Sequence, residues 1–149
     1  MKKLNYLFLL VPFLLLSCSK DSTSSGTPTT YSVVGYWKTT SAVLNGVEKF
    51  GGSNPVKSES YFFDANGNFD TDSYSDTNYT NLVGYSTGTY TIPNTSTINL
   101  SAYAYNPSGT FTGSYNFSCE VLLINATQLQ IKVLNYPSAN DVYVKKFIR

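Results

Sequence analysis

The sequence predicts an all-β domain, an antiparallel up-and-down meander of about eight strands closed into a barrel. Apolar and polar residues alternate along successive segments, which is the period of a strand with one buried face. Short turn sequences separate these segments, and none of them shows the three-and-four apolar spacing of an amphipathic helix. Closure removes the exposed edges that a long meander would leave, and a two-sheet sandwich is the alternative architecture.

The chain begins with a predicted lipoprotein signal peptide, residues 1–17. Two lysines precede a ten-residue apolar run at residues 7–16. This run is shorter than the ~20 residues that a membrane-spanning helix needs. It ends in the letters LLSC, which resemble the bacterial lipobox, where cleavage leaves the cysteine, here Cys18, as a lipidated N-terminus. A plain secretory signal peptide with a cysteine at this position is the alternative.

Residues 18–30 are predicted to comprise the lipidated Cys18 and a flexible Ser/Thr linker, which has no large apolar residue to contribute to a core. Acyl chains such as palmitate on Cys18 would hold the protein in the outer membrane, at ~0.8 kcal/mol per buried methylene. Lys20 and Asp21 resemble the export signal of Bacteroidetes surface lipoproteins. This resemblance favours exposure at the cell surface, and a periplasm-facing protein is the alternative.

The folded domain is predicted at residues 31–149, and its first strand at residues 31–44. An aromatic hairpin follows around the turn DANG, in which Gly67 can adopt the positive φ that side chains resist. The letters DANGNFDTD superficially resemble a calcium loop, but the glycine and glutamate that an EF-hand needs at fixed positions are missing. The alternate polar residues are therefore expected to face water.

A second hairpin is predicted beyond a polar stretch that is rich in tyrosine. Its turn at residues 93–94 places Tyr90 and Ile92 across from Ile98 and Leu100. The tyrosines in or beside the polar stretch are Tyr74, Tyr79 and Tyr85. They form either an exposed loop at the barrel mouth that grips a sugar ring or a partner, or a loop that packs its own aromatic rings.

The clearest pair of strands lies in the last third of the chain. Residues 114–124 alternate over their whole length, residues 128–136 alternate again after a turn, and residues 141–148 form the last strand. The side chains expected to face the interior are Tyr90, Ile98, Phe117, Val121, Leu123, Leu129, Ile131 and Val133. This set is large enough to fill a narrow barrel.

The residue types present give no support for metal binding or catalysis. The chain has no histidine, so no zinc site, other metal site or cofactor is expected. It has no G-x-S-x-G motif or phosphate loop, and its carboxylates share no motif, so it is predicted not to be an enzyme. With Cys18 lipidated, Cys119 has no disulfide partner and is expected to be a buried, unreactive thiol.

Charge argues against a nucleic-acid partner. Without the two lysines of the signal peptide, eight basic and nine acidic residues leave a net charge of about −1. Such a chain lacks the basic surface that binds nucleic acid. Lys145, Lys146 and Arg149 are expected to form a small solvated basic edge. None of these features sets the oligomeric state.

The letters GYW, with Gly35 and Trp37 near the start of the first strand, resemble the G-x-W motif of lipocalin and calycin barrels. Residues 33–149 as a whole are similar to the lipocalin-like domains of Bacteroidetes lipoproteins, from VVGYWKTTSAVLNG through YFFDANGNF and GTYTI to YVKKFIR. The resemblance implies a lipocalin-like barrel in which Gly35 and Trp37 form a structural plug at the bottom. In lipocalins an arginine of the last strands commonly packs over this tryptophan, and Arg149 and Lys145 are the candidates here.

The resemblance implies a non-enzymatic binding module, anchored to the membrane by its lipid, for a small hydrophobic or amphipathic ligand. A fold by itself names no ligand, so the ligand-binding residues stay unknown at this point. The alternative is an envelope or cell-surface structural or interaction protein, with a barrel filled by its own side chains and no small-molecule ligand.

Overall fold

The computed structural model describes residues 32–53, 55–136 and 138–149, which form nine β-strands and no helix. The strands are β1 Gly35–Leu44, β2 Val47–Glu48, β3 Ser58–Phe63, β4 Asn68–Tyr74, β5 Leu82–Asn94, β6 Thr97–Tyr105, β7 Phe111–Ile124, β8 Gln128–Leu134 and β9 Tyr143–Ile148. Within these ranges, no helix has the length and apolar character to cross a membrane. The predicted signal peptide, Cys18 and the linker lie outside the described residues.

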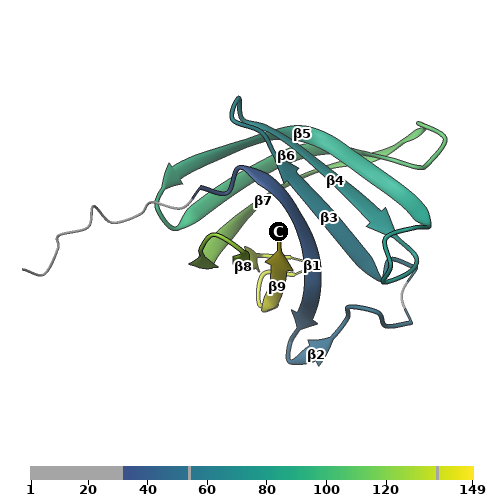
Figure 1. The fold of residues 1–149 in the computed structure, drawn as a ribbon, viewed down its shortest axis with the longest axis horizontal. Helices are drawn as coiled ribbons and strands as arrows, with labels where there is room; N and C mark the ends of the chain where they lie inside the picture. Colours follow the sequence, from purple (N-terminus) through teal and green to yellow (C-terminus); the bar gives the residue numbers. More distant parts are fainter. Residues whose placement is uncertain (1–31, 54, 137) are drawn as a thin grey trace, which may run out of the picture. The chain divides into compact units, whose positions relative to one another are not determined.

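The strands form one antiparallel sheet that closes on itself. Each strand from β3 to β8 pairs with the next along the chain, and β1 pairs with both β3 and β9. Figure 1 shows this order as a colour series, in which yellow β9 returns beside blue β1. Eight longer strands thus make the predicted closed barrel, and the two-residue β2 adds to one edge of β1. The fold-class prediction is confirmed, although β1 begins at Gly35 and not at residue 31.

Two bulges correct one predicted facing, that of Leu123, and one predicted cross-strand pairing, that of Ile92. Leu123 was expected to point inward, but it is 42% exposed because the β7–β8 register shifts between Val121 and Leu123. Ile92 was expected to pair across the second hairpin, but it is 48% exposed because the register also shifts between Thr91 and Asn94. An extra residue at a bulge reverses which face the following side chains occupy. The alternation of apolar and polar residues in the sequence cannot locate the extra residue of a bulge.

The rest of the predicted inward set lies in the core or packs against it. Trp37, Phe63, Phe69 and Phe147 are fully buried, and the rings of Phe63 and Phe69 lie 5.1 Å apart across the β3–β4 pair. Gly67 adopts a φ of 88° in the turn between them, as predicted. These large rings gather where β1 begins and where β3 and β9 end, so one end of the barrel is packed solid.

Cys119 is completely buried within this core, as predicted for a structural thiol. Burial raises the pKa of the Cys119 thiol to about 12, because the apolar surroundings disfavour the thiolate. The thiolate is the reactive form of cysteine, so this side chain is unreactive at neutral pH.

Candidate functional site

The packed end of the barrel is closed by Trp37 and Arg149. The Trp37 indole N–H donates a hydrogen bond to the Val33 carbonyl at 2.6 Å, and the Arg149 guanidinium lies 4.3 Å from the centre of the ring. Arg149 Nη2 also donates to the carbonyls of Ser32 at 2.9 Å and Val34 at 2.8 Å. Of the two candidates for the cation over the tryptophan, Arg149 therefore occupies that place.

Gly35 lies beside the same arginine, with a φ of +133° that side chains rarely adopt. A Cβ at this position would lie 3.5 Å from Arg149 Nε, so the small residue allows the guanidinium to approach β1. The G-x-W motif and the C-terminal arginine thus build one structural unit at this end.

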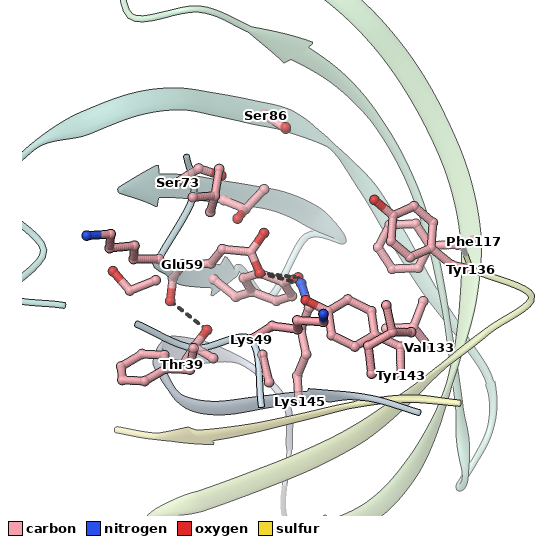
Figure 2. A pocket seen from close by; sticks show the side chains of 18 of the residues that line it. Thr39, Lys49, Glu59, Ser73, Ser86, Phe117, Val133, Tyr136, Tyr143 and Lys145 are labelled. Atoms are coloured by element: carbon pink, nitrogen blue, oxygen red, sulfur yellow. Dashed lines mark hydrogen bonds and ion pairs between the residues drawn. The ribbon is translucent and has the colours of Figure 1, made fainter. Parts of the chain in front are cut away.

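The opposite end of the barrel holds a cavity of about 630 Å³. Its walls come from the end of β1, described residues of the connection between β2 and β3, the start of β3, the end of β4, the middle of β5 and the facing parts of β7, β8 and β9. Phe117, Val133, Tyr136 and Tyr143 form an apolar side, seen together in Figure 2. This volume lies within the ~300–1,000 Å³ range of small-molecule sites. The expectation that inward side chains fill the barrel holds only for the end near Trp37.

A buried ion pair projects into this cavity. Lys145 of β9 donates hydrogen bonds to the Glu59 carboxylate of β3 and, at 2.7 Å, to the Tyr61 hydroxyl (Figure 2). The rings of Tyr61 and Tyr143 lie 5.2 Å and 5.1 Å from the ammonium. Lys145 is only 6% exposed, so the prediction that it belongs to a solvated basic edge is wrong. Alternation along β9 places it on the same face as Phe147.

The ion pair sets the charge states of its members. Burial alone would lower the pKa of Lys145, but the negative charge of Glu59 and the nearby phenols raise this pKa well above its usual 10.5. Burial, reinforced by the charge of Glu59, likewise raises the pKa of Tyr61 well above 10.0. Lys145 is therefore a cation and Tyr61 a neutral phenol at physiological pH.

Hydroxyl groups line the remainder of the cavity. They belong to Thr39, Ser58, Thr71, Ser73 and Ser86. Thr39 donates its hydroxyl hydrogen to the Glu59 carbonyl at 2.7 Å. The Thr71 hydroxyl, in a residue that is 6% exposed, has no hydrogen-bond partner among the described residues. A buried polar atom normally has a partner, so the Thr71 hydroxyl stands out as a free hydrogen-bonding group in the cavity wall.

The tyrosines of the polar stretch mostly pack on each other. The rings of Tyr74 and Tyr79 meet edge to face at 5.4 Å, and the Tyr79 hydroxyl donates to the Thr39 carbonyl. Tyr85 stacks on Tyr105 of β6 at 5.2 Å. Of the two interpretations of this stretch, the loop that packs its own aromatic rings describes the structure.

The DANGNFDTD stretch forms a hairpin in which Asp64 caps the turn. Its carboxylate accepts hydrogen bonds from the backbone N–H groups of Asn66 and Asn68, both at 2.8 Å. The Asn68 side-chain amide donates to the other carboxylate oxygen at 2.6 Å, and this bond, together with the backbone bonds, lowers the pKa of Asp64. The oxygens that a calcium ion would need are therefore occupied. No group of three or more acidic or cysteine side chains comes together among the residues described.

Sequence reasoning missed the Glu59–Lys145 pair and the cavity around it. The alternation of YVKKFI contains the signal for Lys145, because a residue two positions before an inward phenylalanine faces the same way. The sequence contains no signal for Glu59 as its partner, since the two residues lie 86 positions apart.

No protein-family model matches this chain, and no curated protein or solved structure is detectably similar to it. The closed antiparallel barrel, with a tryptophan under an arginine at one end, is compatible with a lipocalin-like fold. Membership among the Bacteroidetes lipoproteins stays a prediction.

Proposed function

We propose that this chain is a lipid-anchored binding module that holds a small amphipathic or hydrophobic ligand in its barrel without converting it. The observation that carries the proposal is the cavity of about 630 Å³ at the end opposite Trp37. Its aromatic and aliphatic wall favours apolar groups, and a few polar atoms would fix their orientation, which is the usual composition of a small-molecule site.

The polar atoms of the cavity support the same proposal. A buried ion pair is costly to desolvate, and apolar residues of similar size would stabilise the barrel at least as well. Glu59 and Lys145 nevertheless lie in the cavity wall, together with the unpartnered hydroxyl of Thr71. A ligand that carries both apolar and hydrogen-bonding groups would complement this wall.

Two neighbouring residues of β5 provide a matched test. Ser86 is buried and lines the cavity, whereas Thr87 is exposed on the outer face. Ser86→Phe should fill part of the cavity and weaken binding of the neutral dye Nile red at least tenfold, and Thr87→Phe should leave binding unchanged. Titration followed by dye fluorescence measures both. Equal binding by the wild type and both variants would place the dye elsewhere and contradict the proposal.

Native mass spectrometry of protein purified from its host would identify a co-purifying ligand. The proposal expects an added mass of a few hundred daltons in the wild type, absent from Ser86→Phe. An unliganded spectrum, together with no Nile red binding, would favour the alternative, an envelope interaction protein. That alternative depends on a filled barrel, and the volume beside Glu59 argues against it.

The anchor is the second part of the proposal. We expect Cys18 to carry the lipid that holds the protein in the outer membrane, because the LLSC pattern precedes a linker and a folded domain. Cys18→Ala should move the protein from the membrane fraction to the soluble fraction. A variant that stays tightly membrane-bound would refute the anchor. Protease treatment of intact cells would distinguish the surface-exposed form, which is cleaved, from the periplasm-facing form, which is protected.

A further inference from the structure

We infer that the ligand of this cavity is an amphiphile with an anionic head group, which Lys49 and Lys57 hold at the rim of the barrel. The inference rests on the proposed function and adds to it the charge and orientation of the ligand. Carboxylate and phosphate heads share the chemistry that would be recognised there.

The first argument is the charge of the cavity wall. Among the described residues, the ionisable lysine and acidic side chains in the wall are Lys49, Lys57, Lys145 and Glu59. Glu59 already pairs with Lys145, and no carboxylate lies within 4 Å of the side-chain ammonium of Lys49 or Lys57 in the part of the chain that the structure describes. The cavity therefore carries two uncompensated positive charges, although the domain as a whole is almost neutral.

The second argument is the place of these two lysines. Both belong to the connection between β2 and β3, which lies at the end of the barrel where β3 begins. Backbone hydrogen bonds fix them there, from Lys49 N to the Ala42 carbonyl at 2.6 Å and from Lys57 N to the Tyr74 carbonyl at 2.7 Å. Both side chains are half-buried, so their charges are less screened than those on an open surface.

Glu48 is the acidic residue next to Lys49 in sequence, and its carboxylate is engaged by the backbone and by Ser41. It accepts hydrogen bonds from the Ser41 hydroxyl at 2.7 Å and from the backbone N–H groups of Ala42 at 2.8 Å, Phe50 at 2.9 Å and Lys49 at 3.1 Å. These bonds direct its charge toward the backbone of the connection. The Lys49 ammonium is left for another anion.

The third argument is the orientation that the interior allows. An anionic head placed beside the ion pair would find the Lys145 ammonium already paired with Glu59, and the Glu59 carboxylate would repel it. With its head at the rim, the body of the ligand would contact Phe117, Val133 and Tyr143. A hydroxyl or carbonyl along that body would reach the wall that contains the unpartnered Thr71 hydroxyl.

Four probes with one tail length test the charge preference: decanoate, decyl phosphate, decanol and decyltrimethylammonium. Calorimetric titration below the micellar concentration should show the two anions binding ~3- to 30-fold more tightly than decanol, which corresponds to two ion pairs near a protein surface. The cationic probe should bind most weakly. Salt should weaken binding of decanoate and leave binding of decanol unchanged. The tighter of the two anions identifies the head group as carboxylate or phosphate.

Two double variants each remove two lysine charges, one from the cavity wall and the other from the outer face of the barrel. Lys49→Gln with Lys57→Gln should reduce decanoate binding to within about twofold of decanol. Lys38→Gln with Lys146→Gln, on the exposed outer face of β1 and β9, should preserve the preference. Thermal melts of both variants would establish that each is folded, which is expected because none of these lysines is fully buried.

The outcomes separate this inference from the proposed function. If Nile red binds and Ser86→Phe weakens it, while all four probes bind equally, the anionic preference is refuted and the binding module stands. A preference that survives in the Lys49/Lys57 variant also refutes it. If neither Nile red nor any probe binds the wild type, both the inference and the proposed function fail.

Discussion

Lys145 is a buried cation in a barrel that has few charged side chains. Its ammonium is held by Glu59, by the Tyr61 hydroxyl and by two aromatic faces, so most of its lost hydration is replaced. Such a pair contributes little net stability compared with apolar residues, because the desolvation of both ions offsets their attraction. Losing one partner has a much larger effect, since the other charge then has no counter-ion.

This asymmetry predicts the result of a double-mutant cycle. Lys145→Met should lower the free energy of unfolding by about 2–4 kcal/mol. The loss stays below that of a fully buried pair because the Glu59 side chain is 23% exposed. Adding Glu59→Gln should restore most of the loss, since no unpaired carboxylate remains. Urea unfolding measures Lys145→Met, Glu59→Gln and the double variant, and a double variant less stable than Lys145→Met would contradict the argument.

The exposed pair of Glu120 and Lys132, 3.9 Å apart, is the control for that cycle. Lys132→Met should change the free energy of unfolding by less than about 1 kcal/mol, because solvent already screens the attraction. If Lys132→Met lowered the free energy of unfolding as much as Lys145→Met does, burial could not be the reason for the effect at Lys145.

Three buried groups predict an alkaline limit to stability. The folded state raises the pKa values of Cys119, to about 12, and of Tyr61 and Lys145, well above their usual 10.0 and 10.5. The unfolded chain releases these protons first, so the free energy of unfolding should fall as pH rises above about 9. Urea unfolding between pH 7 and 11 measures it. In the Cys119→Ala variant, the free energy of unfolding should begin to fall only near pH 10. A wild-type free energy of unfolding that does not change between pH 7 and 11 would refute the prediction.

At the scale of strands, the barrel depends on places where neighbouring backbones approach closely. Gly88 of β5 lies between Phe69 of β4 and Ala102 of β6, its partners in the two ladders. A Cβ on Gly88 would lie 2.0 Å from the Ser101 carbonyl oxygen and 2.6 Å from the Ala102 Cα. Only glycine fits this approach, which is a common reason for a glycine within a strand.

Gly88→Ala should therefore force β5 and β6 apart and lower the free energy of unfolding by about 2–3 kcal/mol, the cost of overpacking. Gly113→Ala in β7 is the matched control, because a Cβ there meets nothing within 4 Å. The control should change stability by less than about 1 kcal/mol. Thermal and urea unfolding of both variants measure the difference, and equal effects would show that the close approach relaxes without cost.

At the scale of the molecule, closure of the barrel depends on β9. This strand pairs with β8 on one side and with β1 on the other, so it joins the last third of the chain to the first strand of the barrel. Its Phe147 lies in the core, and Arg149 follows directly to cover Trp37. Removing the strand would expose two hydrogen-bonding edges at once.

Deletion of residues 143–149 should therefore abolish the cooperative thermal transition and cause aggregation. Arg149→Met, which removes only the cation over Trp37, should keep the transition and lower its midpoint. Circular dichroism melts and light scattering measure the two variants. A deletion variant that melts cooperatively near the wild-type temperature would show that β1 and β8 can close the barrel without β9.

Local patterns in the sequence were sufficient for much of the fold. Alternation and turn residues predicted the strands, the small helix content, the antiparallel order and the closed barrel, because each depends on neighbouring residues. The burial of Cys119 and the positive φ of Gly67 followed from the same local information. The resemblance carried by Gly35 and Trp37 pointed to an arginine near the end of the chain.

The tertiary structure decided the features that arise from contacts between distant strands. A bulge depends on how two strands pair. The exposure of Leu123 and Ile92 therefore could not be predicted from the alternation of residues within either strand alone. The pairing of Glu59 with Lys145 needed β3 and β9 on opposite sides of one interior. The cavity is the volume that the inward side chains of all the strands leave unfilled. This volume depends on how side chains from distant strands pack together, so it is defined only in the closed barrel.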